Sequence, residues 1–82
     1  MQRLKLSEYY KTSELPLIAI LSLSFPIEAV DKANPSKVEF YFKRNSELEK
    51  LVESYWRRVL QVEPQAFFNQ IKGIKSRIYE NR

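Results

Sequence analysis

The stretch from Lys37 to Trp56 constrains the fold most, because its apolar residues change their spacing partway along it. At its start every second residue is apolar, which is typical of a strand with one buried and one wetter face. The buried-face residues are Val38, Phe40 and Phe42. Beyond Asn45 the apolar residues recur at helical spacing and form one stripe. This change predicts a strand followed closely by an amphipathic helix, with the boundary near residues 44–46.

The start of this helix carries a capping-box pattern, in which Ser46 would accept an amide hydrogen bond and Glu49 would reach back to the cap amide. The apolar spacing allows the helix to continue to Leu60, and we predict a helix over residues 46–60. The alternative is an end near Trp56, which would leave residues 59–62 extended and able to pair with the preceding strand.

A second helix is predicted over residues 12–24, with Thr12 or Ser13 as its cap. This segment is apolar nearly all round, as expected for a helix buried in a core, an interface or lipid. A membrane span needs about 20 apolar residues, and the run from Leu15 to Phe25 is much shorter. A signal peptide is disfavoured because acidic residues precede the run where basic ones belong. We therefore expect a helix buried by protein.

The remaining segments complete an α+β domain over residues 1–82, with the order α-β-β-α-α. Residues 26–43 are predicted to form a β-hairpin, which needs a covering helix or a third strand because a hairpin alone is not stable. Pro64 opens a last helix over residues 64–80, with Gly73 on the side opposite its apolar stripe. Residues 1–11 are interpreted as an N-terminal arm, which a second subunit could hold.

Aromatic residues make up 13% of the chain, which indicates a real core and an interface. The aromatic residues expected to pack together are Phe40, Phe42, Phe67, Tyr55 and Trp56. Those expected to be half-exposed are Tyr9, Tyr10, Tyr41 and Tyr79.

The composition argues against catalysis, because the chain has no histidine and no cysteine. It therefore lacks the usual general base, a thiolate nucleophile and the commonest zinc ligands. A single glycine excludes a glycine-rich phosphate loop, and the carboxylates Glu47, Glu49 and Glu53 read as a solvated helix face. We predict no enzyme activity, no catalytic residue, no metal, no cofactor, no small-molecule substrate and no membrane partner, in a cytoplasmic setting.

A basic ridge is the sharpest positive signal. A helix from Pro64 would align cations and aromatics in steps of three or four, so that the cations track phosphates and a tyrosine stacks on a base. The predicted nucleic-acid contacts are Arg57, Arg58, Lys72, Lys75, Tyr79 and Arg82. The competing interpretation is a solvated basic face that complements the helix dipole.

Two functions of different class follow. The first is a protein-interaction or self-assembly module, whose partner is a second copy (a homodimer) or another protein; it rests on the large apolar helix, the aromatic content and the arm. The alternative is a nucleic-acid-binding accessory protein that uses the basic ridge.

Several stretches together resemble a small prokaryotic and phage domain family of unknown function. These are KTSELPL, VEFYF, SELEKLVESYW and VEPQAFFNQIKGIKSRIY, and they span Lys11 to Tyr79. Leu-Pro-Leu departs from the family pattern, where no proline is expected. The resemblance implies a small α+β protein, often carried by mobile elements, and it brings no catalytic residues.

Overall fold

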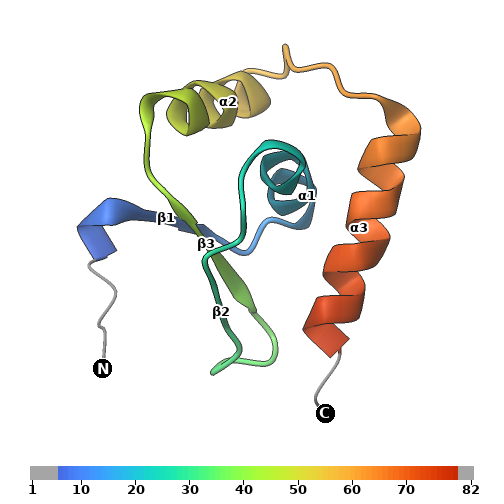
Figure 1. The fold of residues 1–82 in the computed structure, drawn as a ribbon. Helices are drawn as coiled ribbons and strands as arrows, with labels where there is room; N and C mark the ends of the chain where they lie inside the picture. Colours follow the sequence, from blue (N-terminus) through green and yellow to red (C-terminus); the bar gives the residue numbers. More distant parts are fainter. Residues whose placement is uncertain (1–5, 80–82) are drawn as a thin grey trace.

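The computed structural model describes residues 6–79 and confirms the α+β class (Figure 1). The elements in chain order are the 3-10 helix η1 (Leu6–Glu8), β1 (Tyr9–Thr12), α1 (Leu15–Ser24), β2 (Ala29–Asp31), β3 (Glu39–Lys43), α2 (Ser46–Trp56) and α3 (Pro64–Tyr79). The predicted order α-β-β-α-α holds from α1 onward, but a strand precedes it.

The predicted arm is wrong where it overlaps β1, which is a third strand of the sheet. β1 and β2 both pair antiparallel with β3, so the strand order is β1-β3-β2. Tyr10 lies opposite Phe42, and Thr12 lies opposite Phe40. The hairpin thus obtains its third strand from a segment whose own pattern is too short to indicate one. Residues 1–5 of the arm lie outside the described residues.

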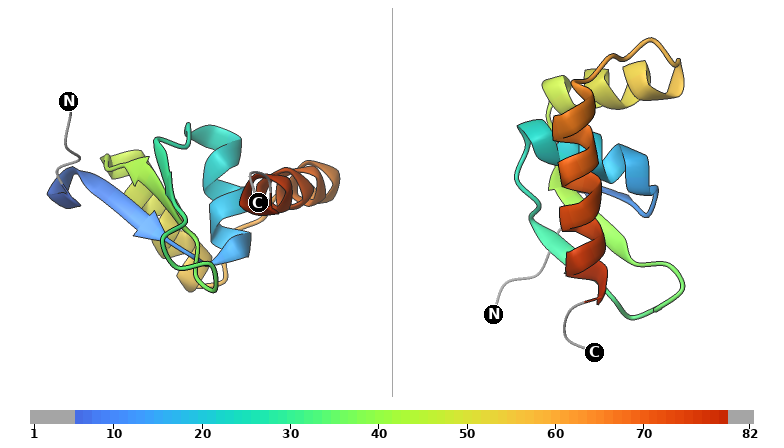
Figure 2. Two further views of the ribbon diagram at one scale, coloured as in Figure 1. Left: turned by 90° about the horizontal axis from the view of Figure 1, so that it is seen from below. Right: turned by 90° about the vertical axis from the view of Figure 1, so that its right-hand side faces the viewer.

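Helix α1 lies between the sheet and α3, as the left view of Figure 2 shows. Its side chains from Leu17 to Leu21 are buried, and Leu17 and Leu21 are fully so. Contact with protein on both sides explains why the sequence is apolar nearly all round. Neither Thr12 nor Ser13 is the N-cap of the helix, because Glu14 occupies the N-cap position. The Thr12 hydroxyl accepts a 3.1 Å hydrogen bond from the Glu14 amide.

The core forms where α1 meets the sheet and the inner faces of α2 and α3. Phe40 and Phe42 are fully buried, as predicted, and so is Leu48. Tyr41 was expected to be half-exposed, but it is only 8% exposed. It lies on the central strand, where Lys11 of β1 and Ala29 of β2 are its neighbours on the two sides. A residue of a central strand has a flanking strand on each side, which leaves less of it open to solvent than at an edge.

Helix α2 begins at Ser46, as predicted, but its cap and its end differ from the prediction. Asn45, not Ser46, is the N-cap, and its side-chain oxygen accepts a 2.8 Å hydrogen bond from the Leu48 amide. The helix ends at Trp56, so the predicted continuation to Leu60 is wrong. Residues 57–63 form a connection without strand pairing, so the extended alternative is right about the end of the helix and wrong about pairing.

Helix α3 begins at Pro64, as predicted, and is described as far as Tyr79. The Glu63 carboxylate caps it by accepting hydrogen bonds from the Ala66 amide at 2.7 Å and the Gln65 amide at 3.2 Å. Ile74 is the most buried residue of its apolar stripe. Among residues 6–79, no helix combines the length and the apolar character needed to cross a membrane.

Candidate interaction site

The connection after α2 starts with a two-bond C-terminal cap. The Arg58 amide donates to the Tyr55 carbonyl at 3.1 Å, and the Val59 amide donates to the Ser54 carbonyl at 3.2 Å. This is the Schellman pattern, in which the residue after the cap takes a left-handed conformation and is usually glycine. Here that residue is Arg58, with φ at 61°. A side chain at this position costs free energy, so the backbone holds Arg58 in an unfavourable conformation.

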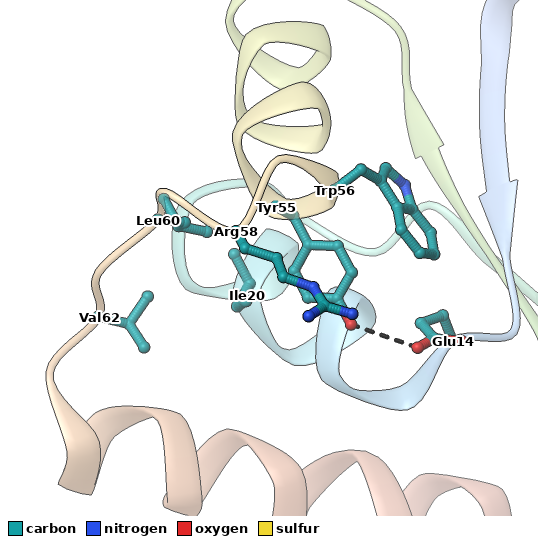
Figure 3. A pocket seen from close by; sticks show the side chains of 7 residues that line it. All are labelled: Glu14, Ile20, Tyr55, Trp56, Arg58, Leu60 and Val62. Carbon is teal, nitrogen blue, oxygen red and sulfur yellow. Dashed lines mark hydrogen bonds between the residues drawn. The ribbon is translucent and has the colours of Figure 1, made fainter.

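Arg58 lines an open pocket of about 490 Å³ at the junction of α1, α2 and the connection (Figure 3). The lining residues are Glu14, Ile20, Tyr55, Trp56, Arg58, Leu60 and Val62. They come from the start and middle of α1, the last turn of α2 and the connection. The early end of α2 creates this pocket, because a helix that continued to Leu60 would carry these side chains elsewhere.

Trp56 stands at the wall of this pocket and is 57% exposed. The prediction that it packs in the core is wrong. The buried stripe of α2 contains Leu48, Leu51 and Tyr55, and Trp56 lies about 100° further round the helix. Its ring makes an edge-to-face contact with the Tyr55 ring, with centroids 5.0 Å apart. Val59 is 67% exposed on the adjoining connection, so the apolar surface continues past the tryptophan.

Tyr55 ties the end of α2 to the start of α1. Its hydroxyl donates a hydrogen bond to a Glu14 carboxylate oxygen at 3.3 Å (Figure 3). Burial raises the pKa of the Tyr55 phenol, and the negative charge of Glu14 and this hydrogen bond raise the pKa further. The phenol is therefore neutral at ordinary pH and acts as a donor that fixes the pocket wall.

The pocket lining carries one acidic side chain, Glu14, and one cationic side chain, Arg58. Glu14 is exposed and accepts from Tyr55. Within the part of the chain that the structure describes, the Arg58 guanidinium has no hydrogen-bond or ion-pair partner. The titratable groups of the pocket lining are Glu14, Tyr55 and Arg58. This set of side chains does not indicate a particular cofactor. No three acidic side chains among residues 6–79 gather to hold a metal ion.

The predicted basic ridge is divided by the fold. Lys72, Lys75 and Tyr79 are exposed on α3, and Tyr79 is 59% exposed. Arg57 and Arg58 lie at the end of α2, and α3 runs away from the connection (Figure 1). Lys72 is eight residues beyond Pro64, about 12 Å along the helix axis. The two arginines therefore do not extend the line of lysines.

Arg57 forms an ion pair instead, with its guanidinium 3.5 Å from the Glu53 carboxylate. Arg82 lies outside the described residues. Nucleic-acid contact by the ridge residues stays a prediction.

Sequence reasoning missed most of this pocket. The helical wheel of α2 could have placed Trp56 beside the buried stripe, had the end of the helix been known. Glu14 and Ile20 carry no local signal, because the fold brings them to the end of α2 from about 40 residues earlier.

Comparison with known proteins gives one family. The model of a domain of unknown function, DUF5659, matches residues 7–80, which is nearly the whole chain. This confirms the resemblance to a small family of unknown function. Neither the curated proteins nor the solved structures contain a match.

Proposed function

The chain belongs to the DUF5659 family, a domain of unknown function, and we propose that it is a non-enzymatic module that associates with a second copy of itself. The single observation that carries this proposal is the exposure of Trp56. Tryptophan is enriched among the residues that dominate binding energy at interfaces, where it is surrounded by apolar contacts that exclude water. Val59 and Val62 supply such neighbours, at 67% and 37% exposure.

The charges around Trp56 favour a second copy as the partner. In a two-fold dimer the same patch of both copies forms the interface. If a residue of one copy contacts a second residue of the partner, the reverse contact is also made. A patch that carries both an acidic side chain, Glu14, and a cationic side chain, Arg58, can pair these charges with their opposites in a second copy after such a rotation. The unpaired guanidinium of one copy would then meet the carboxylate of the other.

Two sequence features that favoured self-association have a different explanation in the fold. Most apolar side chains of α1 are buried in the core, and residues 9–11 of the arm belong to β1, which pairs with β3. Neither needs a second subunit. The proposal therefore rests on the surface around Trp56.

Pocket chemistry supports a role other than catalysis. The lining has no nucleophile paired with a base, and the raised pKa of Tyr55 keeps its phenol protonated near neutral pH. The cytoplasmic setting and the mobile-element origin stay predictions.

Sedimentation equilibrium over micromolar to millimolar protein tests the proposal. The weight-average mass should rise from one chain toward two. Trp56→Ser should weaken association about 30-fold, the factor that corresponds to a loss of about 2 kcal/mol at an interface hot spot. Phe68→Ser is the matched control, because Phe68 is 66% exposed on α3 and lies outside the patch. A strict monomer at every concentration contradicts the proposal.

Charge reversal tests the two-fold arrangement. Glu14→Arg and Arg58→Glu should each weaken association, because each places like charges together across the interface. The double variant should recover most of the loss. Tyr55→Phe controls for the hydrogen bond that Glu14→Arg also removes. Equal losses in the single and double variants, with the fold intact by circular dichroism, would show that the two side chains do not meet.

A further inference from the structure

Two segments that are far apart in the sequence carry basic residues and no acidic ones. Residues 32–38 and 64–79 contain no aspartate or glutamate. Their cations are Lys32, Lys37, Lys72, Lys75 and Arg77. Helix α2 has the opposite character, because three of its four charged residues are acidic. These two segments therefore carry only positive charge, whereas α2 is mainly acidic.

The fold brings these two basic segments together. The Lys32 ammonium donates a 2.6 Å hydrogen bond to the Arg77 carbonyl, across 45 residues of sequence. A small open pocket of about 240 Å³ is lined by Lys37 from the β2–β3 loop and Tyr79 from α3, among others. Figure 1 and the right view of Figure 2 show the loop beside the C-terminal end of α3.

The side chains of this face are accessible. All five cations are exposed, and Tyr79 is 59% exposed. Lys72, Lys75 and Tyr79 share one side of α3, whereas Arg77, two residues from both Lys75 and Tyr79, points to another side. Phe68 adds a second exposed ring on the side of α3 that carries Lys72 and Lys75. The acids that adjoin the two segments along the chain are Asp31, Glu39, Glu63 and Glu80. The Asp31 carboxylate accepts a hydrogen bond from the Ala33 amide. Glu39 pairs with Lys11, and Glu63 caps α3. Glu80 lies outside the described residues.

We propose that this loop–α3 face, defined by Lys32, Lys37, Lys72, Lys75 and Tyr79, binds single-stranded nucleic acid. Cations spaced along a surface pair with successive phosphates, and exposed aromatic rings between them stack on bases without regard to sequence. A duplex hides its bases and would use the cations alone. The face differs from the predicted ridge, because Lys32 and Lys37 join it and Arg57 and Arg58 do not.

The proposal is independent of self-association, because it uses a different surface. Trp56→Ser should therefore still bind an oligonucleotide. Loss of association with retained oligonucleotide binding, or the reverse, tells the two proposals apart.

A salt series with a fluorescein-labelled 20-nucleotide oligothymidylate measures the number of phosphates contacted. The logarithm of the association constant should fall linearly with the logarithm of salt concentration, with a slope of about −2.8 if all four cations of the face take part. Lys72→Gln with Lys75→Gln should reduce the magnitude of that slope by about 1.4. Lys50→Gln on α2 is the matched control and should leave the slope unchanged. No binding at low salt overturns the proposal, and so does an equal effect of the control.

Replacing the ring tests stacking. Tyr79→Leu should weaken binding to the oligothymidylate at least about fivefold, the low end for loss of one stacked base, and should barely affect binding to a duplex of equal length. An oligouridylate should bind like the DNA strand. Equal binding of strand and duplex, with no effect of Tyr79→Leu, contradicts the proposal. Binding to phosphatidylserine vesicles but not to the strand would assign the face to anionic membranes instead.

Discussion

Arg58 is the residue where the local backbone and the proposed function conflict. Its left-handed conformation completes the two-bond cap of α2, a position where glycine carries no steric cost. An arginine held there projects into the pocket beside Trp56. Unfavourable backbone conformations are retained where a side chain has a role, which is why we connect this residue with the interface.

Arg58→Gly should raise the free energy of unfolding by roughly 1 kcal/mol, because glycine adopts this conformation without strain. Urea denaturation of the dilute, monomeric protein measures the change. The same variant should associate more weakly, since the guanidinium is lost. A destabilised Arg58→Gly variant would mean that the side chain contributes more to the monomer than its backbone conformation costs.

Tyr55 gives the fold a dependence on alkaline pH. Its raised pKa means that the folded state holds the phenolic proton more tightly than the unfolded state does. The resulting stabilisation is complete below the ordinary tyrosine pKa of 10.0 and is lost as the pH rises through the higher pKa of the folded state. The urea midpoint of the native chain should therefore fall more steeply above pH 10 than that of Tyr55→Phe. Parallel curves for the two proteins contradict this role of Tyr55.

At the scale of elements, β3 and the start of α2 could be predicted because their signals are local. The alternating residues around Phe40 and the helical stripe after Asn45 need no distant partner to be recognised. β1 could not be predicted, since its four residues become a strand only through pairing with β3. The end of α2 was missed for a related reason. The apolar spacing continues to Leu60. The helix ends because Arg58 adopts a left-handed backbone conformation, which is usual for glycine and could not be predicted from an arginine.

The central position of β3 makes Phe40 the most sensitive core residue. It is fully buried between the paired strands and α1. Phe40→Ala should reduce the free energy of unfolding by about 3–5 kcal/mol, near the whole stability of a domain of this size. Thermal unfolding followed by circular dichroism measures this. A folded variant with an unchanged melting temperature contradicts the assigned position of Phe40 in the core.

Helix α3 contains one position, Gly73, where a substitution should stabilise the protein. Gly73 lies in the middle of the helix, and a β-carbon placed there would meet nothing within 4 Å. Gly73→Ala should therefore raise the free energy of unfolding by about 0.5–1 kcal/mol through helix propensity and a less mobile unfolded chain. Urea denaturation of a monomeric sample is the measurement. A lower stability would indicate that another backbone approaches this face of α3.

At the scale of the molecule, α1 separates two outer layers that have different roles. The sheet covers one side of α1 and α3 the other, while α2 closes one end (Figure 2). The composition and the period of each segment were enough to predict the class and the buried helix. The candidate site was not predictable, because its lining comes from three parts of the chain that meet only when α2 ends at Trp56. The loop lysines beside α3 escaped prediction for the same reason.

Trp56 also provides the most direct measurement of the central claim, because it is the one tryptophan in the chain. Its fluorescence therefore reports on the surroundings of one side chain, which lies in the proposed interface. In the monomer the ring is 57% exposed, so a dilute sample should emit at the long wavelengths of a hydrated indole. We predict that the emission shifts to shorter wavelength as the protein is concentrated, with the same midpoint as the rise in sedimentation mass. Emission that stays constant while the mass increases would place the interface elsewhere and contradict the account.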